Sequence, residues 1–159
     1  MTTGARSLVH GTAVAFDGRA VLLRGPSGAG KSDLALRLLG LGAETCTGLG
    51  LSPYGPRLVA DDQVWLEQQG DGIVASAPET IRGRLEVRGI GIVAVPTVAS
   101  ANLHVVVDLV PVGDVPRMPL EAQTEDLLGV RIALIKLYAF EASAPLKVAL
   151  TVLARPGSS

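Results

Sequence analysis

The chain has 159 residues and 48% hydrophobic content, which fits one globular domain with a single core. Its 14 Lys and Arg residues against 15 Asp and Glu residues lack the basic surplus of a nucleic-acid or anionic-membrane binder, so we expect neither partner. No uninterrupted apolar stretch reaches the ~18 residues that span a bilayer, and the N-terminus lacks a signal-peptide pattern. The single cysteine, Cys46, is expected to have no chemical role, and the sequence predicts one cytoplasmic domain over residues 1–159.

The first elements in chain order are two strands, a glycine-rich turn and a helix. Apolar runs at residues 8–15 and 20–23 flank an Asp-Gly pair, which predicts an antiparallel hairpin. Residues 31–41 then carry Leu and Ala at helical spacing, and Gly40 and Gly42 are available to end the helix.

The rest of the chain is rich in short strands. Residues 43–56 have no sustained periodicity and predict a surface loop. Later apolar runs predict strands at residues 57–60, 64–67, 73–76, 90–95, 103–110 and 130–137. Residues 146–154 follow Pro145 and predict a closing helix, and residues 157–159 a frayed tail. The order of elements indicates an α/β fold with a mixed β-sheet.

The segment before the first helix matches the phosphate-loop pattern G-x-x-x-x-G-K-[ST] at every position. It consists of Gly25, Pro26, Ser27, Gly28, Ala29, Gly30, Lys31 and Ser32. Glycines let backbone N–H groups point inward at phosphate oxygens, beside the positive end of the following helix. We expect Lys31 to hold the β- and γ-phosphates and the Ser32 hydroxyl to ligate Mg²⁺. The alternative is a chance match in a glycine-rich turn, which the strand before it and the helix after it disfavour.

Two acids, Asp61 and Asp62, end the strand at residues 57–60. Many P-loop enzymes place a carboxylate here, near the metal or the attacking group. Because adjacent strand residues point to opposite faces, only one of the two should face the phosphates if strand geometry persists. A solvated acidic turn is the alternative.

A third segment alternates charges and glycines with apolar residues and leads into a buried-looking strand. It reads Leu85-Glu86-Val87-Arg88-Gly89-Ile90-Gly91-Ile92-Val93. Together with Gly30-Lys31-Ser32-Asp33 and Val59-Ala60-Asp61-Asp62, in this order, it resembles the catalytic domain of the HPr kinase/phosphorylase family. The resemblance is strongest over residues 10–95. It implies a P-loop-containing mixed β-sheet with flanking helices, similar to phosphoenolpyruvate carboxykinase.

The resemblance also implies an activity. Family members transfer the γ-phosphoryl group of ATP, with Mg²⁺, to a serine of HPr, a small phosphocarrier protein of the bacterial phosphotransferase system. They also reverse the transfer with inorganic phosphate. By position, Asp62 would take and return the serine proton, and Glu86 would be a second metal-associated carboxylate. His10 would lie near the active site, and Arg117 near the transferred phosphoryl group. A homo-oligomer, a hexamer, is implied by resemblance alone.

The chain also departs from the longer family members. We expect a form without their N-terminal domain, similar to the short, single-domain members, and we expect residues 43–56 to form a long connection. Residues 141–148 stand where longer members carry an arginine-rich segment linked to phosphorolysis, and they offer only Lys147, so we expect weaker phosphorolysis. His104 is expected to be a structural strand histidine. Two other functions stay open: a small-molecule P-loop kinase, and a non-catalytic module that senses ATP or phosphate.

Overall fold

The computed structural model describes residues 4–118 and 121–153. The strands are β1 (Arg6–His10), β2 (Thr12–Phe16), β3 (Arg19–Arg24), β4 (Arg57–Ala60), β5 (Gln63–Gln69), β6 (Gly72–Ser76), β7 (Arg84–Val87), β8 (Gly91–Ala94), β9 (Ser100–Leu109), β10 (Gln123–Leu127) and β11 (Val130–Leu137). The helices are α1 (Lys31–Leu39), α2 (Ala43–Gly48) and α3 (Ala144–Leu153), with short 3-10 turns η1 (Glu79–Ile81) and η2 (Val112–Asp114). Within the described ranges no helix has the length and hydropathy needed to cross a bilayer.

Most strands join one mixed sheet, as the sequence predicted. Its order is β1-β5-β6-β9-β3-β2-β4, and β11 adds to β9 with β10 beyond it. The pairs β3–β9 and β9–β11 are parallel, whereas β2 runs antiparallel to both β3 and β4. Strands β4, β3, β9 and β11 therefore all run in the same direction, and their carboxyl ends lie at the same edge of the sheet. This edge is where the chain leaves β3 for the glycine-rich loop.

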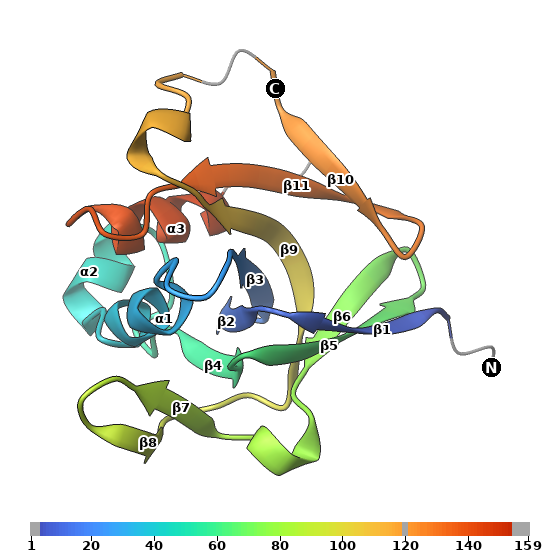
Figure 1. Cartoon of the computed structure of the whole chain (residues 1–159), viewed down its shortest axis with the longest axis horizontal. Helices are drawn as coiled ribbons and strands as arrows, with labels where there is room; N and C mark the ends of the chain where they lie inside the picture. The colour runs from blue at the N-terminus through green and yellow to red at the C-terminus, as the bar shows by residue number, and fades with distance from the viewer. Residues whose placement is uncertain (1–3, 119–120, 154–159) are drawn as a thin grey trace.

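The central strands are buried on both faces, and their side chains alternate between two apolar clusters. Val14 and Val21 belong to the cluster that contains α1 and α3, whereas Ala13 and Leu22 belong to the cluster on the opposite face. Such two-sided burial explains why β2 and β3 read as continuous apolar runs. In Figure 1 the helices α1, α2 and α3 gather on one side of the sheet, while β5 and β6 extend away from them.

Gly11 divides the apolar run at residues 8–15 into two strands. Its backbone N–H donates to the carbonyl of Asp62 at 3.0 Å, and a Cβ built on it would lie 2.9 Å from the Leu23 carbonyl oxygen. β1 pairs with β5, and β2 pairs with β3 through the predicted Asp-Gly hairpin. The hairpin is confirmed, and the glycine places His10 beside the start of β5.

Two expectations about local structure were wrong. Residues 43–56 were expected to be a loop throughout, but the first six form α2, because Cys46 is fully buried in the core and anchors a helical turn there. The strand at residues 90–95 forms as β8, but it is not buried: Ile90 is 76% and Ile92 68% exposed. Among the strands that the structure describes, β7 and β8 pair only with each other as a separate hairpin, which leaves one face to solvent.

One further element, α3, was predicted from the sequence, and another, β10, was missed. The predicted helix at residues 146–154 is α3, with Ala154 and the predicted tail outside the described residues. β10 was not predicted, because Gln123, Thr124 and Asp126 give it no apolar pattern; as an edge strand it is largely exposed.

Arg24, the last residue of β3, ties this strand to β9 and β10. Its Nε donates to Asp108 Oδ1 at 2.8 Å, and its Nη1 donates to Glu125 Oε2 at 2.5 Å. These hydrogen bonds lower the pKa of the Glu125 carboxyl, and the two carboxylates raise the pKa of Arg24. The pairs are part-buried, so solvent screens them less than a surface ion pair.

This lowered pKa predicts a pH-dependent contribution to stability. A carboxyl with a lowered folded-state pKa stabilises the fold above its unfolded pKa of ~4.3, and the contribution is lost as the pH falls. We expect Glu125→Gln to reduce the free energy of unfolding by about 1 to 3 kcal/mol at pH 7. The difference from the unsubstituted protein should shrink towards pH 3, as measured by urea unfolding.

Asp126→Asn is the matched control for this measurement. Asp126 lies on the same strand but makes only an exposed contact with Arg131 at 3.8 Å. It should change the unfolding free energy by less than about 0.5 kcal/mol. Equal stability of Glu125→Gln and the unsubstituted protein at pH 7 would contradict the role given to the Arg24 network.

Candidate active site

The glycine-rich loop connects the end of β3 to the first turn of α1. Gly28 and Gly30 have φ angles of 85° and 98°, in the left-handed region that favours glycine. The Ala29 N–H donates to the Pro26 carbonyl at 3.0 Å and closes a turn within the loop. α1 begins directly at Lys31, so its unpaired N–H groups and the positive end of its dipole lie at the loop. This is the strand, loop and helix arrangement predicted for a phosphate-binding loop.

Lys31 folds back over this loop. Its Nζ donates to the carbonyl oxygens of Gly25 at 2.6 Å and Pro26 at 3.0 Å, and the residue is 8% exposed. The ammonium group is therefore held at the loop. When a phosphate binds there, its oxygens would replace the two carbonyl oxygens as hydrogen-bond acceptors.

Asp61 lies beneath the loop and is almost completely buried. Its Oδ1 accepts hydrogen bonds from Ser32 Oγ at 2.7 Å and Thr12 Oγ1 at 2.9 Å. Its Oδ2 accepts one from the Glu86 backbone N–H at 3.2 Å. A buried carboxylate is stabilised by such donors. Asp61 therefore holds Ser32 and Glu86 in place beside the loop.

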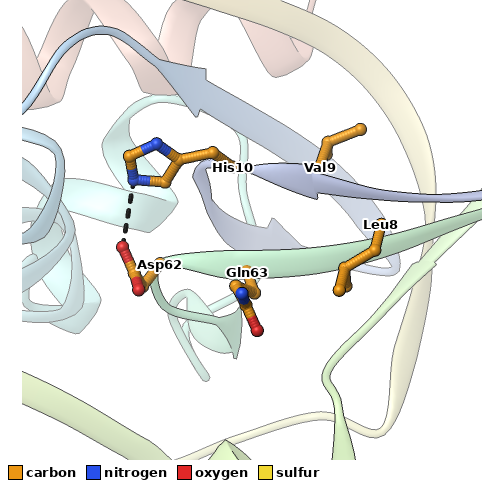
Figure 2. A pocket seen from close by; sticks show the side chains of 5 residues that line it. All are labelled: Leu8, Val9, His10, Asp62 and Gln63. Atoms are coloured by element: carbon orange, nitrogen blue, oxygen red, sulfur yellow. Dashed lines mark hydrogen bonds and ion pairs between the residues drawn. The ribbon is translucent and has the colours of Figure 1, made fainter.

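Asp62 is exposed and lines a cleft beside the phosphate loop. Its Oδ1 lies 3.0 Å from His10 Nε2, and Figure 2 shows the two side chains meeting, His10 from the end of β1 and Asp62 from just before the start of β5. The pair also borders a smaller pocket of about 410 Å³ that Leu8, Val9 and Gln63 complete. Both partners are exposed, so the contact orients the groups more than it stabilises the fold.

The expectation that only one of the two acids faces the phosphates rested on a condition that the structure does not meet. It required strand geometry to continue, but β4 ends at Ala60 and Asp62 has a φ of 69°. The chain turns between the acids, so Asp61 contacts Ser32 while Asp62 lines the cleft above it.

A cleft of about 880 Å³ joins these groups. It is lined by His10, Ser27, Gly28, Gly30, Lys31, Ser32, Asp33, Leu36, Asp62, Glu86, Val87, Arg88, Gly89, Ile90, Gly91 and Phe140. The β7–β8 hairpin and its turn supply one wall, and the loop with α1 supplies another.

The residues around the cleft include oxygen donors of the kind that a magnesium ion needs. Within residues 4–118 and 121–153, no three His, Cys, Asp or Glu side chains form a ready-made metal site. Mg²⁺ does not need one, since it binds through one or two carboxylates together with phosphate oxygens and water. The Ser32 hydroxyl, the Asp61 carboxylate and the Glu86 side chain are hard oxygen donors of the kind that Mg²⁺ prefers. This donor set fits the ion.

The structure brings together most of the residues singled out in the sequence. His10, Lys31, Ser32, Asp62 and Glu86 all line the cleft. Gly25 and Pro26 meet the Lys31 ammonium through their carbonyls.

Two residues singled out in the sequence lie outside the cleft lining, and two residues of the site were not predicted. Arg117 is exposed in the loop after η2, and the described lining of the cleft does not include it. His104 lies on β9, half-buried and outside that lining. Sequence reasoning missed Thr12, whose hydroxyl meets Asp61, and Phe140, which lines the cleft from a distant segment. No local motif marks either residue.

Comparison with known proteins decides the family. The model of the HPr Serine kinase C-terminal domain matches residues 2–147, which is most of the chain. The chain belongs to this family.

Individual relatives agree with this assignment. The HPr kinase/phosphorylases of Burkholderia lata and Burkholderia mallei are each 36% identical over 138 residues, or 80% of this chain. The chain spans 39% of the length of these relatives. The solved structure of the Hpr(Ser) kinase/phosphatase from Coxiella burnetii superimposes with a TM-score of 0.73 at 26% identity, covering 92% of this chain and 94% of that chain. The family's fold is therefore that of this domain.

The close packing around Gly30 predicts that one added methyl group at this position will destabilise the phosphate loop. A Cβ on Gly30 would lie 2.9 Å from Ala139 Cβ and 3.0 Å from Phe140 Cζ, at a φ of 98° that side chains rarely adopt. We expect Gly30→Ala to reduce the free energy of unfolding by about 1 to 3 kcal/mol and to weaken binding of phosphate compounds. Thermal unfolding and calorimetric titration with tripolyphosphate measure the two effects.

Gly42→Ala serves as the control, because Gly42 has a φ of −75° and nothing within 4 Å of a built Cβ. It should leave both quantities close to those of the unsubstituted protein. A Gly30→Ala protein that matches Gly42→Ala in both measurements would show that the loop does not need glycine there.

Proposed function

We propose that this domain is a cytoplasmic, ATP- and Mg²⁺-dependent protein serine kinase that phosphorylates an HPr-type phosphocarrier protein. The observation that carries the proposal is the Asp62 carboxylate, oriented by His10 at 3.0 Å, across the cleft from an intact phosphate-binding loop. Family membership and the names of the relatives support the choice of acceptor.

Phosphate binding rests on the loop and on Lys31. Backbone N–H groups of the loop and of the first turn of α1 would donate hydrogen bonds to phosphate oxygens, and Lys31 adds a positive charge at the β- and γ-phosphates. Because charge spreads over the transferring group, such fixed donors supply most of the acceleration. A bound Mg²⁺ would neutralise phosphate charge, with Ser32, Asp61 and Glu86 holding it directly or through water.

Proton transfer rests on Asp62. The acceptor serine gives its hydroxyl proton to an Asp62 carboxylate oxygen as its Oγ bonds to the γ-phosphorus. The bond from that phosphorus to the bridging oxygen then breaks, and ADP leaves with the electron pair. His10 keeps the carboxylate aimed into the cleft and can share the proton through Nε2. A module that only senses ATP or phosphate has no need of such a base.

Three further parts of the proposal rest on resemblance. Arg117 is proposed to approach the transferred phosphoryl group when the acceptor binds; it is exposed in the loop after η2 and outside the cleft lining. A homo-oligomer, a hexamer, is proposed for the assembled protein. Phosphorolysis is proposed as the reverse reaction, in which inorganic phosphate attacks phosphoserine and releases pyrophosphate.

The decisive experiment incubates the domain with HPr and Mg-ATP and looks for acid-stable phosphoserine. A set of small-molecule acceptors is run in parallel. Phosphorylation of a small molecule but not of HPr would favour a small-molecule kinase, and ATP binding without any transfer would favour a sensing module.

Asp62→Asn should separate binding from chemistry. The amide keeps the size of the side chain but cannot take the serine proton, so transfer to HPr should fall by ~10²- to 10⁴-fold while ATP still binds. Lys31→Ala should lose both ATP affinity and transfer. Calorimetry measures binding, and phosphoserine formation measures transfer.

Asp71→Asn is the control for charge alone, since Asp71 lies in the exposed turn between β5 and β6. It should retain transfer. Full transfer activity in Asp62→Asn would remove the general base from the proposal.

Phosphorolysis should be slower than in longer family members. Inorganic phosphate brings more negative charge beside phosphoserine, so cationic side chains are needed. Lys147 is the only basic residue of residues 141–148, and its Nζ is paired with the Glu141 carboxylate. The measurement is pyrophosphate release from serine-phosphorylated HPr and phosphate, beside a longer member under the same conditions. Equal or faster release here would show that the arginine-rich segment is dispensable.

A further inference from the structure

The cleft extends to both sides of the phosphate-binding loop. In the sheet, β4 lies two places to one side of β3 and β11 lies two places to the other, and these strands run in the same direction. The segment after β4 brings Asp62 into the cleft, and the segment after β11 brings Phe140. The proposed transfer chemistry uses only the Asp62 side.

Phe140 is an unusual lining residue. It is one of two phenylalanines in the chain and is 54% exposed. Its ring lies against the backbone of Gly30, since Cζ and Cε1 would be 3.0 and 3.1 Å from a Cβ built there. Tyr138 meets the ring edge-on, with centroids 5.7 Å apart and planes at 70°. The ring is therefore supported from behind while much of its surface stays open.

The segment that carries Phe140 is braced by the first helix. Arg37 on α1 donates to the carbonyl of Ala139 through Nη2 and to the carbonyl of Glu141 through Nη1, one on each side of Phe140. Asp33 accepts from Arg37 Nε at 3.0 Å and holds the guanidinium in place. A ring fixed in this way loses little conformational freedom when a ligand packs on it.

The direction of the nucleotide follows from the proposed function, on which this inference rests. The γ-phosphate must lie on the Asp62 side of the loop for transfer, so the α-phosphate, the ribose and the base extend to the other side. Phe140, which follows β11, is an open aromatic group of the cleft lining on the side away from Asp62. Aromatic side chains stack on the face of a base, which removes apolar surface of both from water.

We propose that Phe140 is the stacking platform for the adenine base of ATP. Arg37 braces the backbone on both sides of this ring. The subsite explains why an apolar ring stays exposed beside a polar loop, and why Gly30 must leave room for it.

The test compares a ligand that has a base with one that has none. Phe140→Ala should weaken Mg-ATP binding by roughly 10- to 100-fold, as loss of one base–aromatic stack does, and should leave Mg-tripolyphosphate binding unchanged. Phe140→Trp should keep ATP affinity, and ATP should quench the new indole fluorescence while tripolyphosphate should not. Calorimetry and fluorescence titration measure these effects.

Leu150→Ala is the matched control, because Leu150 is an exposed apolar residue of α3 that does not line the cleft. It should bind both ligands as the unsubstituted protein does. Unchanged tripolyphosphate binding in Phe140→Ala also shows that the variant is folded.

The outcomes separate the two proposals. Equal ATP affinity in Phe140→Ala and the unsubstituted protein, with tripolyphosphate bound by both, would overturn the stacking subsite and leave the kinase proposal standing. An equal loss of both ligands in Phe140→Ala would also overturn it, since the ring would then support the loop and not the base. An unsubstituted protein that binds neither ligand would overturn both proposals.

Discussion

The Asp61 carboxylate accepts hydrogen bonds from Thr12 on β2, Ser32 at the start of α1 and the Glu86 N–H on β7. Burying a charge is costly unless donors replace the lost water, so the meeting of these segments offsets the cost of burying Asp61. Their meeting places the Ser32 hydroxyl and Glu86 on the same side of the phosphate loop. The stability of this region and the geometry of the proposed ion site thus depend on the same group.

Strand direction gives the cleft its two sides. Because β4, β3 and β11 end at the same edge of the sheet, the segments that follow them converge on one place from different parts of the chain. This is the general location of ligand sites in sheets with parallel strands. An acid and an aromatic ring, Asp62 and Phe140, flank the loop as a result.

The ion pairs of Arg24 fix the strand from which the loop departs. This residue directly precedes Gly25, and its bonds to Asp108 and Glu125 join the end of β3 to β9 and β10. A binding loop rich in glycine needs a rigid support if its N–H groups are to keep their direction. β10 supplies part of that support although its sequence is polar and gave no strand signal.

Local information in the sequence determined the phosphate loop, the helix after it, the hairpin before it and most of the strands. Glycine spacing and apolar periodicity act between near neighbours, so they are readable without the fold. Tertiary structure alone decided the bend at Gly11, the helix α2, the solvent exposure of Ile92 and the two carboxylate directions. Each depends on which strand or helix packs beside the residue, as the contact of Asp61 with Ser32, 29 residues away, illustrates. Phe140 reached the loop in the same way, because only the direction of β11 carries it there.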